Sequence, residues 1–161
     1  MNVLEAIQTK RSVRAYQETE VPDEVIRQIL DGGRRAQSSM NRQPWTFVVV
    51  RQNLKELAAY GSYAGPLAGA DFGIVLVSSS EWAFDIGQAA AYMQLAAWSL
   101  GVSSCLVWLG EAEKVRELLG IPADQHVEMA ISFGYAKDSA LRPPMKGGRK
   151  PLEEVVRWEH W

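Results

Sequence analysis

From Ile86 to Gly110 the chain carries no charged residue, and this stretch constrains the fold more than any other part of the sequence. It is long enough to cross a bilayer as a helix. Its composition opposes that interpretation, because it is rich in alanine, contains several Gln and Ser residues and is interrupted by Gly101. A helix that is apolar on nearly every face otherwise lies in a core or at an interface. We therefore expect a buried or interface helix over Phe84–Leu100, ended by Gly101, and no membrane association.

Four stretches are rich in β-branched and aromatic residues, a composition that favours strands. They alternate with helical patterns along the chain, and several of them are apolar throughout. Such strands are usually covered on both faces, so we expect a sheet flanked by helices, with a strand order that the pattern leaves open. The length of 161 residues suits a single domain that spans residues 1–161. The predicted strands are Trp45–Val50, Phe72–Val77, Val102–Trp108 and Val127–Tyr135.

Two helices are predicted before the first strand. The first covers Val3–Thr9 and is amphipathic, with its apolar side chains expected to face inward, namely Val3, Leu4, Ala6 and Ile7. The second begins near Pro22, because proline and the acids that follow it suit a first helical turn. Its end is weakened by Gly32 and Gly33, since glycine is a poor helix former.

Composition excludes several classes of function. The formal net charge of −2, without a basic block, argues against a nucleic-acid partner, whose phosphates need a clustered cationic face. Cys105 is the single cysteine, so no internal disulfide can form, and a reducing cytoplasmic setting is expected. The first residues lack the apolar core of a signal peptide, so no secretion is expected. His126 and His160 have no partner at metal-ligand spacing, so no metal site is predicted.

Common catalytic patterns are also missing from the sequence. It contains no G-x-G-x-x-G motif, no G-x-x-x-x-G-K-S/T motif and no G-x-S-x-G motif. Cys105 lies in a predicted apolar strand, where a buried inert thiol is favoured over a nucleophile. We therefore assign no catalytic residue.

Two basic clusters are candidates for binding a phosphate. Lys10 to Arg14 places three cations and a hydroxyl within five residues, directly after a short helix. Arginine offers paired planar donors and serine a short one, which suits a phosphate dianion. A second cluster, Lys146 to Lys150, has the same character. Either cluster could equally be a solvated surface patch.

A polar segment, Ser38 to Trp45, joins a predicted helix to a predicted strand. Its short hydroxyl and carboxamide side chains can hydrogen-bond to a heteroaromatic ring. The alternative for this segment is an ordinary polar loop that ends a helix.

These segments together resemble the nitroreductase family of FMN enzymes. The turn from Arg11 to Arg14, followed by Tyr16, looks like the N-terminal phosphate motif of that family, with Lys10 where arginine is usual. Residues Ala36–Phe47, AQSSMNRQPWTF, resemble its Pro-Ser-x-x-Asn-x-Gln-Pro-Trp segment. The resemblance continues in order over nearly the whole chain, through Asp85–Gly101, Leu118–Pro122, Gly134-Tyr135, Arg142-Pro143 and Arg149–Val156.

The resemblance implies a fold, a cofactor and an assembly. The fold would be α+β, a central mixed β-sheet flanked by helices, in an interlocked homodimer. The phosphate and ribityl end of FMN would be held by Lys10, Arg11, Ser12, Arg14 and Arg149. The flavin would be touched by Ser38, Ser39 and Asn41 of the partner subunit. Backbone amides near Leu109 and Gly110 would lie near the reactive nitrogen of the flavin.

The resemblance also implies a reaction. Hydride would pass from NADH or NADPH through FMN to a small-molecule electron acceptor, such as a nitroaromatic or a quinone. Two alternatives stay open: a flavin-dependent oxidase or dehydrogenase of a specific metabolite, and a non-catalytic flavin-binding protein. The loop Gly61–Gly69 is short for the family, so we expect an open pocket that accepts several acceptors, with Trp82 or Trp108 as stacking walls.

Overall fold

The computed structural model describes residues 1–79, 83–140 and 148–161. Its elements follow one another along the chain as α1 (Val3–Thr9), α2 (Asp23–Arg34), η1 (Ser39–Asn41), β1 (Trp45–Val50), α3 (Leu54–Ala59), η2 (Gly65–Gly69), β2 (Phe72–Ser78), α4 (Ala83–Ser99), β3 (Ser103–Trp108), α5 (Ala112–Leu119), β4 (His126–Gly134), η3 (Asp138–Ala140) and α6 (Leu152–Val155). The predicted α+β class is confirmed, and the predicted strands agree with the observed ones to within one residue at each end.

Within the described residues the sheet has four strands in the order β1-β2-β4-β3, and every neighbouring pair is antiparallel. A parallel pairing enters the sheet as an isolated bridge between Ser12 and Ser104, so the mixed character rests on the N-terminal segment. β4 comes last in sequence but lies between β2 and β3. The outer strands, β1 and β3, form the two edges.

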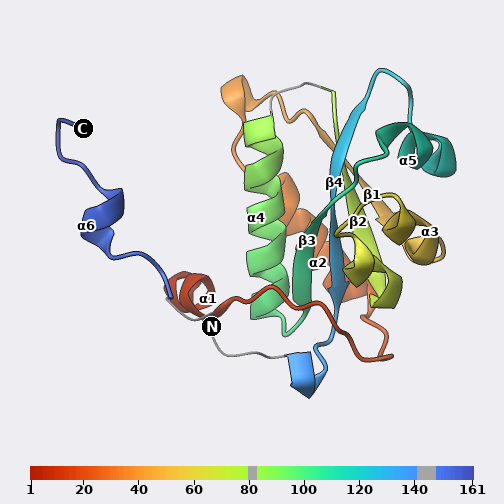
Figure 1. The fold of residues 1–161 in the computed structure, drawn as a ribbon, viewed down its shortest axis with the longest axis horizontal. Helices are drawn as coiled ribbons and strands as arrows, with labels where there is room; N and C mark the ends of the chain where they lie inside the picture. Colours follow the sequence, from red (N-terminus) through yellow and green to blue (C-terminus); the bar gives the residue numbers. More distant parts are fainter. Residues whose placement is uncertain (80–82, 141–147) are drawn as a thin grey trace.

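Helices cover both faces of the sheet (Figure 1). α2 and α4 pack on one face, and α3, η2 and α5 pack on the other. Each face has its own apolar core, and burying one such side chain contributes roughly 1.5–3 kcal/mol. The first core includes Ile29, Ile74, Met93, Ile131 and Phe133, and the second includes Leu57, Leu67, Val75, Val107 and Val115.

α2 runs through Gly32 and Gly33 instead of ending before them. The reason is close packing against α4: a Cβ atom at Gly33 would lie 2.5 Å from Cγ of Met93. The close contact between α2 and α4 therefore offsets the predicted weakening of α2 by glycine. A larger residue at this position would push the two helices apart. Along the whole described part of the chain, no helix combines the length and hydropathy needed to cross a bilayer.

Several large apolar side chains remain exposed. The prediction that Val3, Leu4 and Ile7 face inward is wrong for the single chain, because α1 buries only Ala6. An amphipathic pattern indicates that the apolar face of a helix packs against something. In α1 the described residues of the same chain do not cover this face. The C-terminal segment with α6 projects away from the sheet and its helices (Figure 1), and it exposes Leu152, Val155, Trp158 and Trp161.

Candidate functional site

The turn Lys10–Arg14 is held against the edge strand β3. The backbone N–H of Val13 donates to the Ser104 carbonyl at 3.0 Å, and the Val13 side chain is fully buried. Because side chains alternate in extended backbone, burial of Val13 directs Ser12 and Arg14 outward. Both are exposed. The turn thus presents a hydroxyl and a guanidinium from a backbone that the sheet fixes.

Cations from both ends of the chain meet at this turn. Burial lowers the pKa of Lys10; the Cys105 thiol opposes this, and the positive charges of Arg14 and Arg149 lower the pKa further. Arg149, predicted only through the family resemblance, therefore lies near Lys10. Among the described residues, none of these cations forms an ion pair with an acid. An uncompensated cation group of this kind favours a bound anion.

Arg11 takes a different direction from its neighbours. Its Nη1 donates to the carbonyls of Gln8 and Lys10 at 3.0 and 3.1 Å. These carbonyls lie at the C-terminal end of α1, where a cation is favourable. The structure thus groups Lys10 with Arg14 and Arg149, while Arg11 also stabilises the end of α1.

The loop Ser38–Asn41 has an unusual backbone. Met40, Asn41 and Gln43 have φ angles of 50°, 54° and 50°, a left-handed region that costs non-glycine residues roughly 1–2 kcal/mol each. Hydrogen bonds from backbone N–H groups to side-chain oxygens help to hold this loop: Ser39 N–H donates to Oδ2 of Asp85 at 3.2 Å, and Gln43 N–H donates to Oγ of Ser38 at 2.9 Å. Asp85 is buried in the first turn of α4. Strain of this kind is often retained where a loop serves a ligand.

The turn and the loop lie at opposite ends of α4 (Figure 1). The loop is bonded to Asp85 in the first turn, whereas Trp98 in the last turn donates its Nε1–H to Oγ1 of Thr9 at 2.9 Å, next to Lys10. At about 1.5 Å per residue, Asp85 and Trp98 are about 20 Å apart along the helix. Within one chain the two polar groups therefore face separate regions of the surface.

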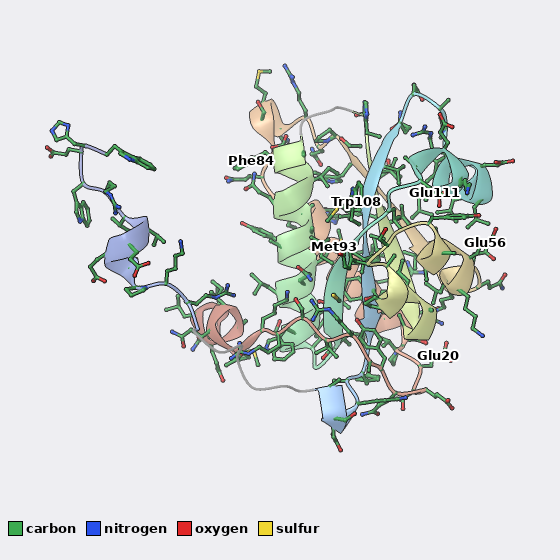
Figure 2. The ribbon with its side chains drawn as sticks, viewed as in Figure 1. Glu20, Glu56, Phe84, Met93, Trp108 and Glu111 are labelled. Carbon is green, nitrogen blue, oxygen red and sulfur yellow. The ribbon has the colours of Figure 1, made fainter. Side chains whose placement is uncertain are left out.

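A third part of the site follows the end of β3. The Leu109 side chain is buried, and Gly110 is exposed beside the Trp108 ring. Figure 2 labels Trp108, the last residue of β3. This residue is 54% exposed. This loop is fixed by the turn after α3: Glu111 N–H donates to the Tyr60 carbonyl at 3.1 Å. Gly61 lies so close to the backbone of Trp108 that a Cβ atom at Gly61 would be 2.1 Å from the Trp108 carbonyl oxygen. The backbone from Trp108 to Gly110 is thus held in one position.

Comparison with known proteins assigns this arrangement to a family. The model of the nitroreductase family matches residues 7–68 and 63–135. A protein of Archaeoglobus fulgidus, named for an inferred NADH dehydrogenase/NAD(P)H nitroreductase activity, is 36% identical over 151 residues, which are 84% of this chain and 86% of that protein. The chain belongs to the nitroreductase family. The resemblance inferred from the motifs is thereby confirmed.

Solved structures of nitroreductase relatives share the whole fold. An FMN-dependent nitroreductase from Clostridium difficile is 26% identical, with a TM-score of 0.86 over 98% of this chain and 99% of that chain. The structure of an inferred nitroreductase from Desulfovibrio desulfuricans in complex with FMN is 29% identical, with a TM-score of 0.86 over 100% of this chain and 98% of that chain. Members of this family are oxidoreductases, so the chain is classed as an enzyme.

Three residues that matter to this nitroreductase site were not singled out from the sequence. Asp85 carries the signal of an acid in a first helical turn, and Gly61 is one of several glycines in a loop, but neither signal identifies its contact. Tyr16 was noted only as part of a motif. Of the residues considered from the sequence, Trp82, Arg142, Pro143 and Lys146 lie outside the described residues.

Proposed function

We propose that this chain is an FMN-dependent oxidoreductase that passes hydride from NADH or NADPH to a small-molecule acceptor such as a nitroaromatic or a quinone. The observation that carries the proposal is the group of Lys10, Arg14 and Arg149, which lacks an acidic partner among the described residues. The relatives whose titles name FMN and NAD(P)H support the choice of cofactor and of electron donor.

The residues present fit FMN. Its phosphate would be held by the cations and the hydroxyl of the N-terminal turn, which are Lys10, Arg11, Ser12, Arg14 and Arg149. The flavin ring would lie against the loop with Ser38, Ser39 and Asn41. The exposed backbone at Leu109 and Gly110 would face its reactive edge: in the described part of the chain, the Gly110 N–H has no hydrogen-bond acceptor.

FMN supplies the hydride chemistry when bound, so the protein needs no acid or base of its own. The residues of the chain bind and orient. The cation group neutralises the phosphate, the strained loop presents fixed polar groups to the ring, and the turn at Gly61 holds the Trp108–Gly110 backbone. Trp108 is exposed, so its ring can stack against a flat acceptor at one wall of the site.

We also propose that the enzyme is a homodimer with shared sites. The turn Lys10–Arg14 and the loop Ser38–Asn41 lie at opposite ends of α4 in one chain. A second copy of the chain can therefore bring its loop to the turn of the first. The exposed apolar faces of α1 and of the C-terminal segment support this assembly, since monomers rarely expose large apolar patches. Symmetric dimers are the commonest homo-oligomers.

The affinity for FMN should fall at alkaline pH. Burial lowers the pKa of Lys10 in the free protein, and a bound phosphate favours the protonated lysine, so the pKa is higher in the complex. Affinity is therefore greatest below the lowered pKa and declines above it, by up to about tenfold per pH unit between the two values. Titrations of FMN fluorescence from neutral to alkaline pH measure this decline.

Lys10→Arg is the control for that experiment, because arginine keeps its charge throughout this range. The decline should be much weaker in this variant, and also for riboflavin, which lacks the phosphate. An equal decline in the parent and the variant would place the titrating group elsewhere.

The proposed reaction has a direct optical test. The purified chain should be yellow or become so with added FMN, and NADH or NADPH should bleach it in the absence of oxygen. A panel of quinones and nitroaromatics should then restore the colour, with several acceptors active. Flavin binding without bleaching would favour a metabolite oxidase or a carrier, and a chain that binds no FMN would overturn the proposal.

A further inference from the structure

The hydroxyl of Tyr16 lies in the interior, two residues beyond the cation turn. It is 2.7 Å from the Val13 carbonyl, 2.8 Å from Oγ of Ser132 and 3.3 Å from the Ser132 carbonyl. Tyr16 is 3% exposed, and Ser132, in the middle strand β4, is fully buried. One hydroxyl therefore joins the N-terminal segment to the centre of the sheet.

The distances favour one arrangement of this network. Tyr16 has one hydrogen, and its nearest acceptor is the Val13 carbonyl at 2.7 Å. The Ser132 hydroxyl also has one hydrogen, and the acceptors within its reach are the Tyr16 oxygen and the Cys105 carbonyl, which is 3.2 Å from Oγ. Burial raises the pKa of Tyr16, and the Ser132 hydrogen bond acts against it with a smaller effect. The phenol thus remains a neutral donor at physiological pH.

This hydrogen bond completes the fixation of Val13. Its N–H donates to the Ser104 carbonyl in β3, its side chain is fully buried, and its carbonyl accepts from Tyr16. Both peptide groups that flank Val13 are thereby held. The side chains of Ser12 and Arg14 leave the backbone on either side of these peptides, so their directions are set by the same contacts.

The Tyr16 ring is itself held in place. A Cβ atom at Gly134 would lie 3.0 Å from three atoms of Tyr16, so the ring packs directly on the β4 backbone. On either side of Tyr16, Gln17 N–H donates to the Tyr135 carbonyl at 2.8 Å, and Lys137 N–H donates to the Ala15 carbonyl at 3.1 Å. A side chain with this support can transmit the position of the sheet to the turn.

We propose that Tyr16 is a positioning residue for FMN: its hydroxyl ties the Val13 carbonyl to Ser132 and so aims Ser12 and Arg14 at the phosphate. The inference rests on the proposed function, because it assumes that the turn binds the FMN phosphate. It differs from a purely structural role in one respect. Loss of the hydroxyl should weaken the binding of phosphate more than the binding of the flavin ring.

Tyr16→Phe in the full chain tests this inference. The ring and its packing on Gly134 remain, and only the hydrogen bonds are lost. Binding of FMN and of riboflavin to the flavin-free protein is measured by fluorescence titration. We expect FMN affinity to fall about three- to tenfold, and riboflavin affinity by less than about twofold, on the scale of one hydrogen bond. Tyr92→Phe is the control, because this tyrosine is 46% exposed and its hydroxyl forms no hydrogen bond with the described residues, so both affinities should be unchanged.

Ser132→Ala is a second variant, which removes the hydroxyl that hydrogen-bonds to Tyr16 and leaves the tyrosine in place. It should shift the FMN-to-riboflavin ratio in the same direction by a smaller factor, and it decides the question if Tyr16→Phe does not fold. A ratio equal to that of the parent, or an equal loss for both flavins, would overturn the inference. If the parent itself binds FMN no better than riboflavin, the proposed phosphate site fails, and the inference fails with it.

Discussion

A chain that ends at Pro151 should sediment as a monomer and retain little FMN, whereas the full chain should sediment as a dimer with FMN bound. The deletion removes the exposed apolar side chains of the C-terminal segment but keeps Arg149, so the cations proposed to bind the phosphate are all still present. Flavin is lost because the proposed site needs the loop of a second copy. Sedimentation velocity and the ratio of flavin to protein absorbance measure both effects.

Substitutions within the same segment separate apolar burial from chain length. Trp158 and Trp161 are its most exposed large side chains. Replacing both by serine should raise the dissociation constant of the dimer at least about 30-fold, since a buried tryptophan at an interface often contributes about 2 kcal/mol or more. Glu153→Gln with Glu154→Gln is the matched control in the same segment and should leave the dimer intact. A full chain that is monomeric, or a shortened chain that dimerises as tightly, would contradict this prediction.

Gly61→Ala should lower the free energy of unfolding by about 2–3 kcal/mol, near the top of the range for overpacking. The added Cβ would lie 2.1 Å from the Trp108 carbonyl oxygen and 3.1 Å from its carbon, so backbone must move and no flexible side chain can yield. The same movement shifts the Trp108–Gly110 backbone, so hydride transfer from NADH or NADPH should slow as well. Urea denaturation and anaerobic stopped-flow reduction measure these two effects.

Gly65→Ala is the control for that change, because it lies in the same short loop and an added Cβ there meets nothing within 4 Å. It should change stability by no more than about 1 kcal/mol, and in the stabilising direction, because alanine restricts the unfolded chain. Equal stability of the Gly61 and Gly65 variants would mean that the turn can move away from Trp108 without cost.

The strands could be predicted from sequence because their β-branched and aromatic residues leave a local record, even in β1, where only Val50 is buried. Trp45–Val50 is β1 as predicted, and Phe72–Ser78 differs from its prediction by one residue. The strand order has no such record, since it depends on which long segments pack together. The exposed face of α1 is similar: its apolar stripe predicts that the face is covered, but says nothing about which chain covers it.

The candidate site residues that belong to a sequence motif could be predicted. The features that depend on backbone conformation or tertiary contacts could not. The cations of the N-terminal turn are visible in the sequence, and the family resemblance added Arg149. The left-handed conformation of Met40, Asn41 and Gln43 has no glycine to signal it. The bond from Asp85 to Ser39 and the contact of Gly61 with Trp108 depend on tertiary packing, which no local pattern records.

The place of β4 in the sheet governs the order in which this protein can assemble. Among the described strands β4 is translated last, yet it separates β2 from β3 and supplies Ile131 to one core and Ala130 to the other. Until His126–Gly134 has left the ribosome, β3 lacks the strand it pairs with and β2 has an open edge. Open edges invite pairing with other chains, and distant pairings form slowly. The nascent chain therefore passes through an aggregation-prone stage that ends only after β4 has been translated.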